Sequence, residues 1–199
     1  RYVRDRAWLW TTLAAAAVGL LGFYGPVTVL LPWLVKHELG GGASGFGLIL
    51  AAGGVGAVAA AVAVGQAGLP GPPLRVAYVS WAIGAFAIAG YGLADTVWQA
   101  VVASVAVQGG MAVGAIAWGS LLQEAVPAKL LGRVSSLDWL LSSALVPVSL
   151  ALTAPAAAAF GPRSVLIGAG ALSGLALTVL AGALRRNAQG TLSARLTPL

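Results

Sequence analysis

Long apolar stretches dominate this chain, and short polar or Pro- and Gly-rich segments separate them. A helix needs about 20 apolar residues to cross a bilayer core of about 30 Å. The stretches that reach this length are 8–35, 45–66, 74–94, 97–122, 134–159 and 164–184. The pattern therefore predicts an all-α bundle of six transmembrane helices, with a short segment 1–7 before it and a polar tail 185–199 after it.

The composition is typical of a membrane protein. Of the 199 residues, 59% are hydrophobic and 8% are charged, whereas soluble domains carry about 25% charged residues. So few charges could not cover a soluble surface, but a surface that faces lipid needs none. The sequence has no cysteine, which excludes disulfides, thiolate metal sites and a cysteine nucleophile.

The basic residues fall unevenly on the two sides of the predicted spans. Lys and Arg are enriched in cytoplasmic segments, and here only Lys36 and Arg163 fall on one side. The other side has Arg1, Arg4, Arg6, Arg75, Lys129, Arg133, Arg185, Arg186 and Arg195. This bias predicts that both termini are cytoplasmic, which requires an even number of spans. We therefore interpret the net charge of +6 as a sign of topology and not of nucleic-acid binding.

Polar side chains and helix breaks inside the spans mark candidate functional positions, because both are costly in lipid. The candidates for lining a substrate path are Tyr24, Thr28, Trp81, Gln108 and Trp118. The candidates for a hinge are Gly25, Pro26 and Pro147. For Gln108 and Tyr24, a place on the path and an ordinary interhelical hydrogen bond fit the sequence equally well.

Asp138 is the one acidic residue inside a predicted span. One interpretation is a carboxylate that couples transport to protons, since buried acids bind protons more readily. The favoured interpretation is an ion pair or helix-cap network with Lys129 and Arg133, which are close in sequence at the cytoplasmic end of the span.

Two further patterns bear on function. Gly42-Ala43-Ser44-Gly45 matches the GxSG pattern of intramembrane serine proteases, but the only histidine lies in the same loop, so no other span supplies a general base. The pairs Gly110–Gly114 and Gly170–Gly174 predict close helix packing. The sequence therefore favours a packed bundle without enzymatic activity, metal or cofactor.

The segment that follows the fourth span contains Val126-Pro127 and then Leu130-Leu131-Gly132-Arg133-Val134, and the first span is broken at Gly25-Pro26 and Pro32. These features resemble the C-terminal half of major facilitator superfamily transporters, in the branch of bacterial multidrug and enterobactin exporters. The resemblance implies two six-helix halves, each a 3+3 inverted repeat, with substrate held between them. It also implies a cytoplasmic gate at Lys129, Gly132, Arg133 and Asp138.

The resulting expectation is half of a secondary-active exporter of small amphipathic molecules, drug-like or siderophore-like, in the bacterial inner membrane. Its expected partners are membrane lipid, an N-terminal six-helix half, a small-molecule substrate and, as a candidate coupling ion, protons. The start at Arg1, without Met, suggests a chain cut from a longer one. The alternatives are a standalone six-helix protein that dimerises to form a transporter or channel and, less favoured, a membrane-embedded enzyme.

Overall fold

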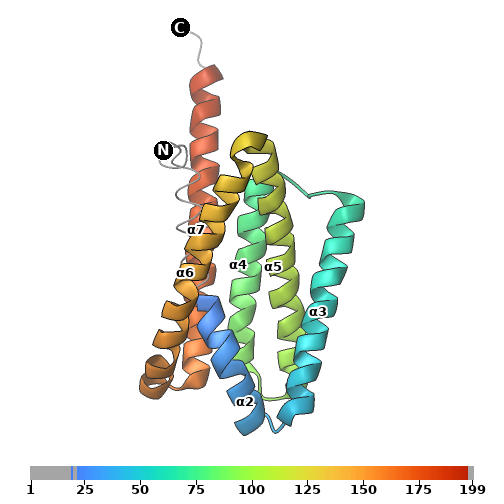
Figure 1. Cartoon of the computed structure of the whole chain (residues 1–199), viewed down its shortest axis with the longest axis vertical. Helices are drawn as coiled ribbons and strands as arrows, with labels where there is room; N and C mark the ends of the chain where they lie inside the picture. Colours follow the sequence, from blue (N-terminus) through green and yellow to red (C-terminus); the bar gives the residue numbers. More distant parts are fainter. Residues whose placement is uncertain (1–18, 20–21, 197–199) are drawn as a thin grey trace.

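The computed structural model describes residue 19 and residues 22–196, with the side chains of residue 141 and residues 183–196 left aside. Within that part of the chain every element is a helix (Figure 1). The elements are the π-helix η1 (Pro26–Leu30), then α2 (Leu31–His37), α3 (Gly42–Ala67), α4 (Pro73–Leu93), α5 (Val97–Ala125), α6 (Ala128–Phe160) and α7 (Pro162–Leu196).

Five of these helices, α3 to α7, are long and apolar enough to cross a membrane. The expectation of an all-α, multi-pass membrane protein is therefore confirmed. Part of the first predicted span, 8–35, and the whole of segment 1–7 lie outside the described residues. The sixth crossing and the 3+3 repeat stay predictions.

Two helices extend six or more residues past one end of the span predicted from hydrophobicity. α6 begins at Ala128, directly after Pro127, which is the N-cap residue in an extended conformation (φ −54°, ψ 138°). The gate candidates Lys129, Gly132 and Arg133 therefore lie in the first turns of a helix. α7 continues from its apolar part, Pro162–Gly182, through the polar tail to Leu196.

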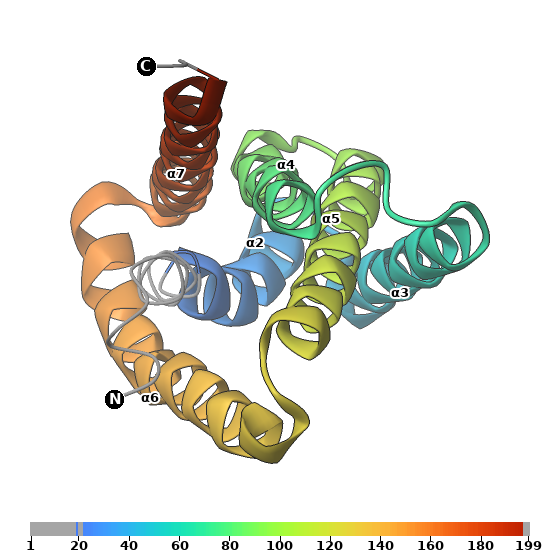
Figure 2. The ribbon, with the colours of Figure 1, turned by 90° about the horizontal axis from the view of Figure 1, so that it is seen from above.

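The helix α4 lies between α5 and α7 and packs closely against both (Figure 2). The two predicted glycine pairs make this packing possible. A methyl group built on Gly110 would lie 2.6 Å from the carbonyl oxygen of Ser80, and one built on Gly170 would lie 2.5 Å from the amide nitrogen of Ala89. These distances leave room only for hydrogen, so the prediction of close packing at both pairs is confirmed.

Seen from above, α4, α5, α6 and α7 surround the first helix, η1 with α2, and α3 lies outside this group against α5 (Figure 2). The first helix changes its winding where the prolines fall. A proline cannot donate to the carbonyl four residues earlier, so the helical ladder loses bonds at Pro26 and Pro32. The wider π turn, Pro26–Leu30, lies between these two positions. Such π turns in α-helices are often found at functional sites.

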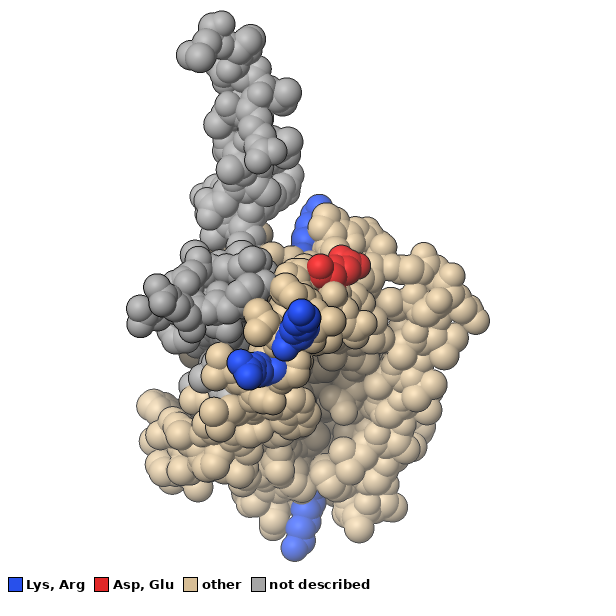
Figure 3. Space-filling model, turned by 45° about the horizontal axis from the view of Figure 1, so that its top comes forward, with Lys and Arg blue, Asp and Glu red and all other residues tan. Residues whose placement is uncertain are grey.

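Charged side chains lie around the end of the bundle at which α5 and α6 meet and at the opposite end, with uncharged surface between them on the face that Figure 3 shows. At the opposite end, Arg163 binds Glu38 through Nε at 2.5 Å and Asp95 through Nη1 at 3.2 Å. Nη1 also donates to the carbonyl oxygen of Gly92 at 3.3 Å. One side chain therefore holds together the end of α2, the α4–α5 loop and the start of α7.

Candidate functional site

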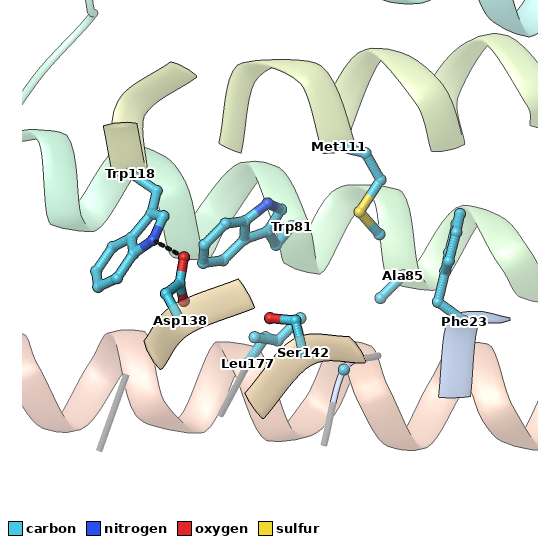
Figure 4. Close-up of a pocket in the computed structure, with 9 residues that line it drawn as sticks. Phe23, Trp81, Ala85, Met111, Trp118, Asp138, Ser142 and Leu177 are labelled. Carbon is cyan, nitrogen blue, oxygen red and sulfur yellow. Dashed lines mark hydrogen bonds between the residues drawn. The ribbon is translucent and has the colours of Figure 1, made fainter. Parts of the chain in front are cut away.

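A cavity of about 170 Å³ lies among α4, α5, α6, α7 and the residues that precede η1 (Figure 4). Its wall is formed by Gly19, Phe23, Trp81, Ala85, Met111, Trp118, Asp138, Ser142 and Leu177. Residues before η1 and residues of α7, the last helix, both contribute to it, so the cavity depends on packing between parts of the chain that are far apart in sequence. Three of the predicted functional residues, Trp81, Trp118 and Asp138, meet here.

The indole of Trp118 donates a hydrogen bond from Nε1 to Oδ2 of Asp138, at 3.2 Å. Trp118 is buried and Asp138 is half-buried. The expected ion pair of Asp138 with Lys129 or Arg133 is not formed: these two side chains are exposed, and the described residues include no salt bridge between them and Asp138. The physical reason is helical geometry. Asp138 lies on the face of α6 that is turned to the cavity (Figure 4), whereas Lys129 and Arg133 lie on its exposed face.

The two cavity tryptophans lie next to each other. The ring centroids of Trp81 and Trp118 are 6.4 Å apart and the ring planes are tilted by 52°. Trp81 also makes an edge contact with Tyr78, at 6.3 Å between centroids. On its other side, Trp81 lies against Gly114 of α5, where a methyl group would be 2.9 Å from Cε2 of the indole. Its neighbours therefore fix the position of Trp81.

The cavity has two chemically different ends. Asp138 and the Trp118 N–H form a polar end (Figure 4). Phe23, Met111 and Ala85 form the other end, and they offer only apolar surface. The wall is thus amphipathic along its length.

The other substrate-path candidates do not line this cavity. Tyr24 is 39% exposed, and its ring meets that of Phe23 edge-on at 5.5 Å. Thr28 is also exposed. Gln108 lies in the α3–α5 contact, where a methyl group on Gly53 would be 2.8 Å from its Cγ. Its place fits the packing interpretation that the sequence left open.

The predicted hinge positions come together where the first helix crosses α6. The amide of Gly25 donates to Oγ of Ser149 at 2.8 Å, and Thr153 Oγ1 donates to the carbonyl oxygen of Ser149 at 2.7 Å. Pro26 begins the π turn directly after Gly25, and Pro147 lies two residues before Ser149. Two proline-disturbed helix segments therefore meet at a buried hydrogen bond between Gly25 and Ser149.

The remaining gate candidates lie on the outer surface of α6. Lys129, Gly132 and Arg133 are exposed, and a methyl group on Gly132 would have no heavy atom within 4 Å apart from the adjoining backbone of its own helix and its chain neighbours. Ser136 Oγ donates to the Gly132 carbonyl oxygen at 2.8 Å, one turn back in the same helix. These residues lie apart from the cavity, so the structure separates them from Asp138.

The sequence reasoning missed several wall residues, of which Ser142 is the most instructive. It follows Asp138 by four residues, so the two share a face of α6. A polar residue one turn after an intramembrane acid was a usable signal. Phe23, Met111 and Leu177 had no such signal, because apolar residues occur at many positions in every span.

No group of three or more His, Asp and Glu side chains that could hold a metal occurs among the described residues. The fold and the cavity together define a multi-pass α-helical membrane protein with an amphipathic pocket inside its bundle. Comparison with protein-family models, with curated proteins and with solved structures gave no match.

Proposed function

We propose that this chain is the C-terminal six-helix half of a secondary-active transporter of the major facilitator type, which exports small amphipathic molecules across the bacterial inner membrane. A second six-helix half would complete the substrate site, and the two halves would rock to open it to alternate sides. The observation that carries the proposal is the cavity among the helices, with its aromatic and acidic wall.

The wall of this cavity has the make-up of a ligand site. Binding sites in proteins are mostly apolar, with a few placed polar groups that fix the orientation of the ligand, and bundles build such sites from facing helices. Here Trp81, Trp118 and Phe23 supply broad apolar surface, and Asp138 and Ser142 supply polar groups. The apolar part of an amphipathic molecule would contact the aromatic side chains, and its polar part would contact Asp138 and Ser142.

Alternating access needs helices that bend and contacts that change. The crossing at Gly25 and Ser149 supports the first requirement, because both helices are weakened there by proline. The exposed position of Arg133 supports the second requirement, contacts that change. A guanidinium makes strong charge-assisted bonds, and at the helix start it is available to a partner half in one of the two conformations.

Efflux from cells that express the complete gene tests the proposal. A panel of amphipathic compounds is loaded, and its loss is followed with and without a proton uncoupler. We expect export that weakens in Trp81→Leu and Arg133→Ala, while Trp139→Leu retains it, since Trp139 is 73% exposed and outside the cavity wall. An uncoupler that stops export would support protons as the coupling ion.

Two results would overturn the proposal. The first is a panel in which no compound leaves the cells faster than from cells without the gene. The second is export by purified, reconstituted copies of this chain alone, which would instead support the standalone protein that dimerises.

A further inference from the structure

We propose that the cavity binds organic cations, with the positive charge at Asp138 and the apolar body toward Phe23 and Met111. This inference rests on the proposed function and deepens it by naming the substrate class. The three observations behind it are the charge of the wall, the position of the two indoles and the order of polar and apolar groups along the cavity.

Asp138 sets the sign of the ligand charge. Among the described wall residues it is the only charged one, and no Lys or Arg accompanies it there. The indole N–H of Trp118 can only donate, so its bond to Oδ2 at 3.2 Å makes that oxygen an acceptor and holds it toward the cavity. A half-buried acceptor of this kind attracts a cation and repels an anion, because charges interact strongly away from water.

Trp81 and Trp118 add a second cation-binding element. The face of an indole attracts a cation within about 6 Å of the ring centre, and Trp is the best of the aromatic residues for this contact. The two rings lie 6.4 Å apart and are tilted by 52°, so they form a corner, with Asp138 beside it (Figure 4). An alkylated ammonium fits such a corner better than a bare metal ion, since it presents apolar surface as well as charge.

The other end of the cavity sets the shape of the ligand. Phe23, Met111 and Ala85 offer dispersion contacts and, on their side chains, no hydrogen-bonding group. The thioether of Met111 adapts to aromatic partners of different shape. The volume of about 170 Å³ is close to that of an engineered cavity of about 150 Å³ that accepts benzene. The apolar end therefore has room for one aromatic ring, with the ammonium head placed at Asp138.

Isothermal titration of the purified protein in detergent micelles tests the inference. The probes are phenyltrimethylammonium, the neutral amide N,N-dimethylbenzamide and the anion benzenesulfonate, which have similar size and one ring each. We expect the cation to bind about tenfold or more tightly than the amide, and the anion to bind more weakly still. Equal affinity for cation and amide would overturn the inference.

Matched variants locate the binding. Asp138→Asn should weaken cation binding about tenfold or more and leave amide binding unchanged, while Glu124→Gln, which removes an exposed carboxylate outside the cavity, should change neither. Trp81→Leu should weaken cation binding about twofold to tenfold, with Trp139→Leu as its control. If Asp138→Asn does not fold, the comparison of probes on the unmodified protein still decides. Unchanged cation affinity in folded Asp138→Asn would overturn the inference.

The inference and the proposed function can fail separately. Selective binding of phenyltrimethylammonium by a protein that exports no compound from cells would support the cation site and overturn the transporter. Export of neutral compounds, without selective binding of the cation, would support the transporter and overturn the cation site.

Discussion

The indole of Trp81 in α4 lies directly on the backbone of Gly114 in α5, so that any side chain at Gly114 would overlap the ring. We therefore expect Gly114→Ala to displace Trp81, to change the cavity and to lower the free energy of unfolding by about 1–3 kcal/mol, as overpacking does. Thermal unfolding in detergent and the tryptophan emission spectrum measure both effects.

Gly119 in the same helix is the control, because its methyl would have no heavy atom within 4 Å apart from the adjoining backbone of its own helix and its chain neighbours. Alanine is favoured over glycine in helices by about 1 kcal/mol, so Gly119→Ala should be neutral or stabilising. Equal stability of the two variants would contradict the close contact of Trp81 with Gly114.

The crossing of the first helix with α6 gives a second prediction. A methyl group on Gly25 would overlap Thr153 Oγ1 and lie 2.7 Å from the carbonyl carbon of Ser149. Gly25→Ala should therefore separate the two helices and destabilise the protein by about 1–3 kcal/mol. Gly47→Ala, in the open first part of α3, should cause no such loss. The measurement is again thermal unfolding, and a stable Gly25→Ala variant would be inconsistent with this crossing.

Arg163 gives a third prediction, because it joins three segments at one end of the bundle. Its side chain is 33% exposed, so water and salt weaken the ion pairs. Arg163→Ala should cost about 1 kcal/mol of stability at low salt and less in 1 M salt. Lys36→Ala, at the same end of the bundle and outside the ion pairs of the described residues, should cost less at both salt concentrations. A cost that does not change with salt would mean that packing, and not charge, explains the effect.

The predicted orientation can be tested directly, since the sequence has no cysteine. Lys36→Cys and Lys129→Cys each introduce one thiol at an exposed position. In intact cells, a maleimide that cannot cross the membrane should label residue 36 and not residue 129, and both should react after the cells are opened. Labelling of residue 129 in intact cells would reverse the orientation derived from the basic residues.

The fold class was predictable from the sequence because lipid imposes a simple rule on length and composition. The glycine pairs were predictable for a similar reason, since Gly110 and Gly170 have few other uses in a membrane helix. In both cases the information is local. In almost any bundle, a long run of apolar residues predicts a membrane span, and two glycines four positions apart predict close helix packing.

The cavity was predictable only in part. Trp81, Trp118 and Asp138 stood out as polar or aromatic residues in apolar spans, but their meeting depends on how three helices rotate about their own axes. Sequence proximity suggested Lys129 and Arg133 as partners of Asp138, whereas the partner is Trp118, 20 residues earlier on another helix. The bond of Gly25 to Ser149, 124 residues apart, had no signal at all in a single sequence.

The central place of α4 has a consequence for how this protein tolerates random substitution. Half of the apolar 18-residue stretch of α4 is buried, against 17% of the corresponding stretch of α3. α4 also contacts glycines of α5 on one side and glycines of α7 on the other. A larger residue in α4 would therefore disturb two interfaces at once, while the outer face of α3 accepts almost any apolar residue. In a mutational scan, the positions of α4 should show the strongest selection against change, although this helix supplies only two residues to the cavity wall, Trp81 and Ala85.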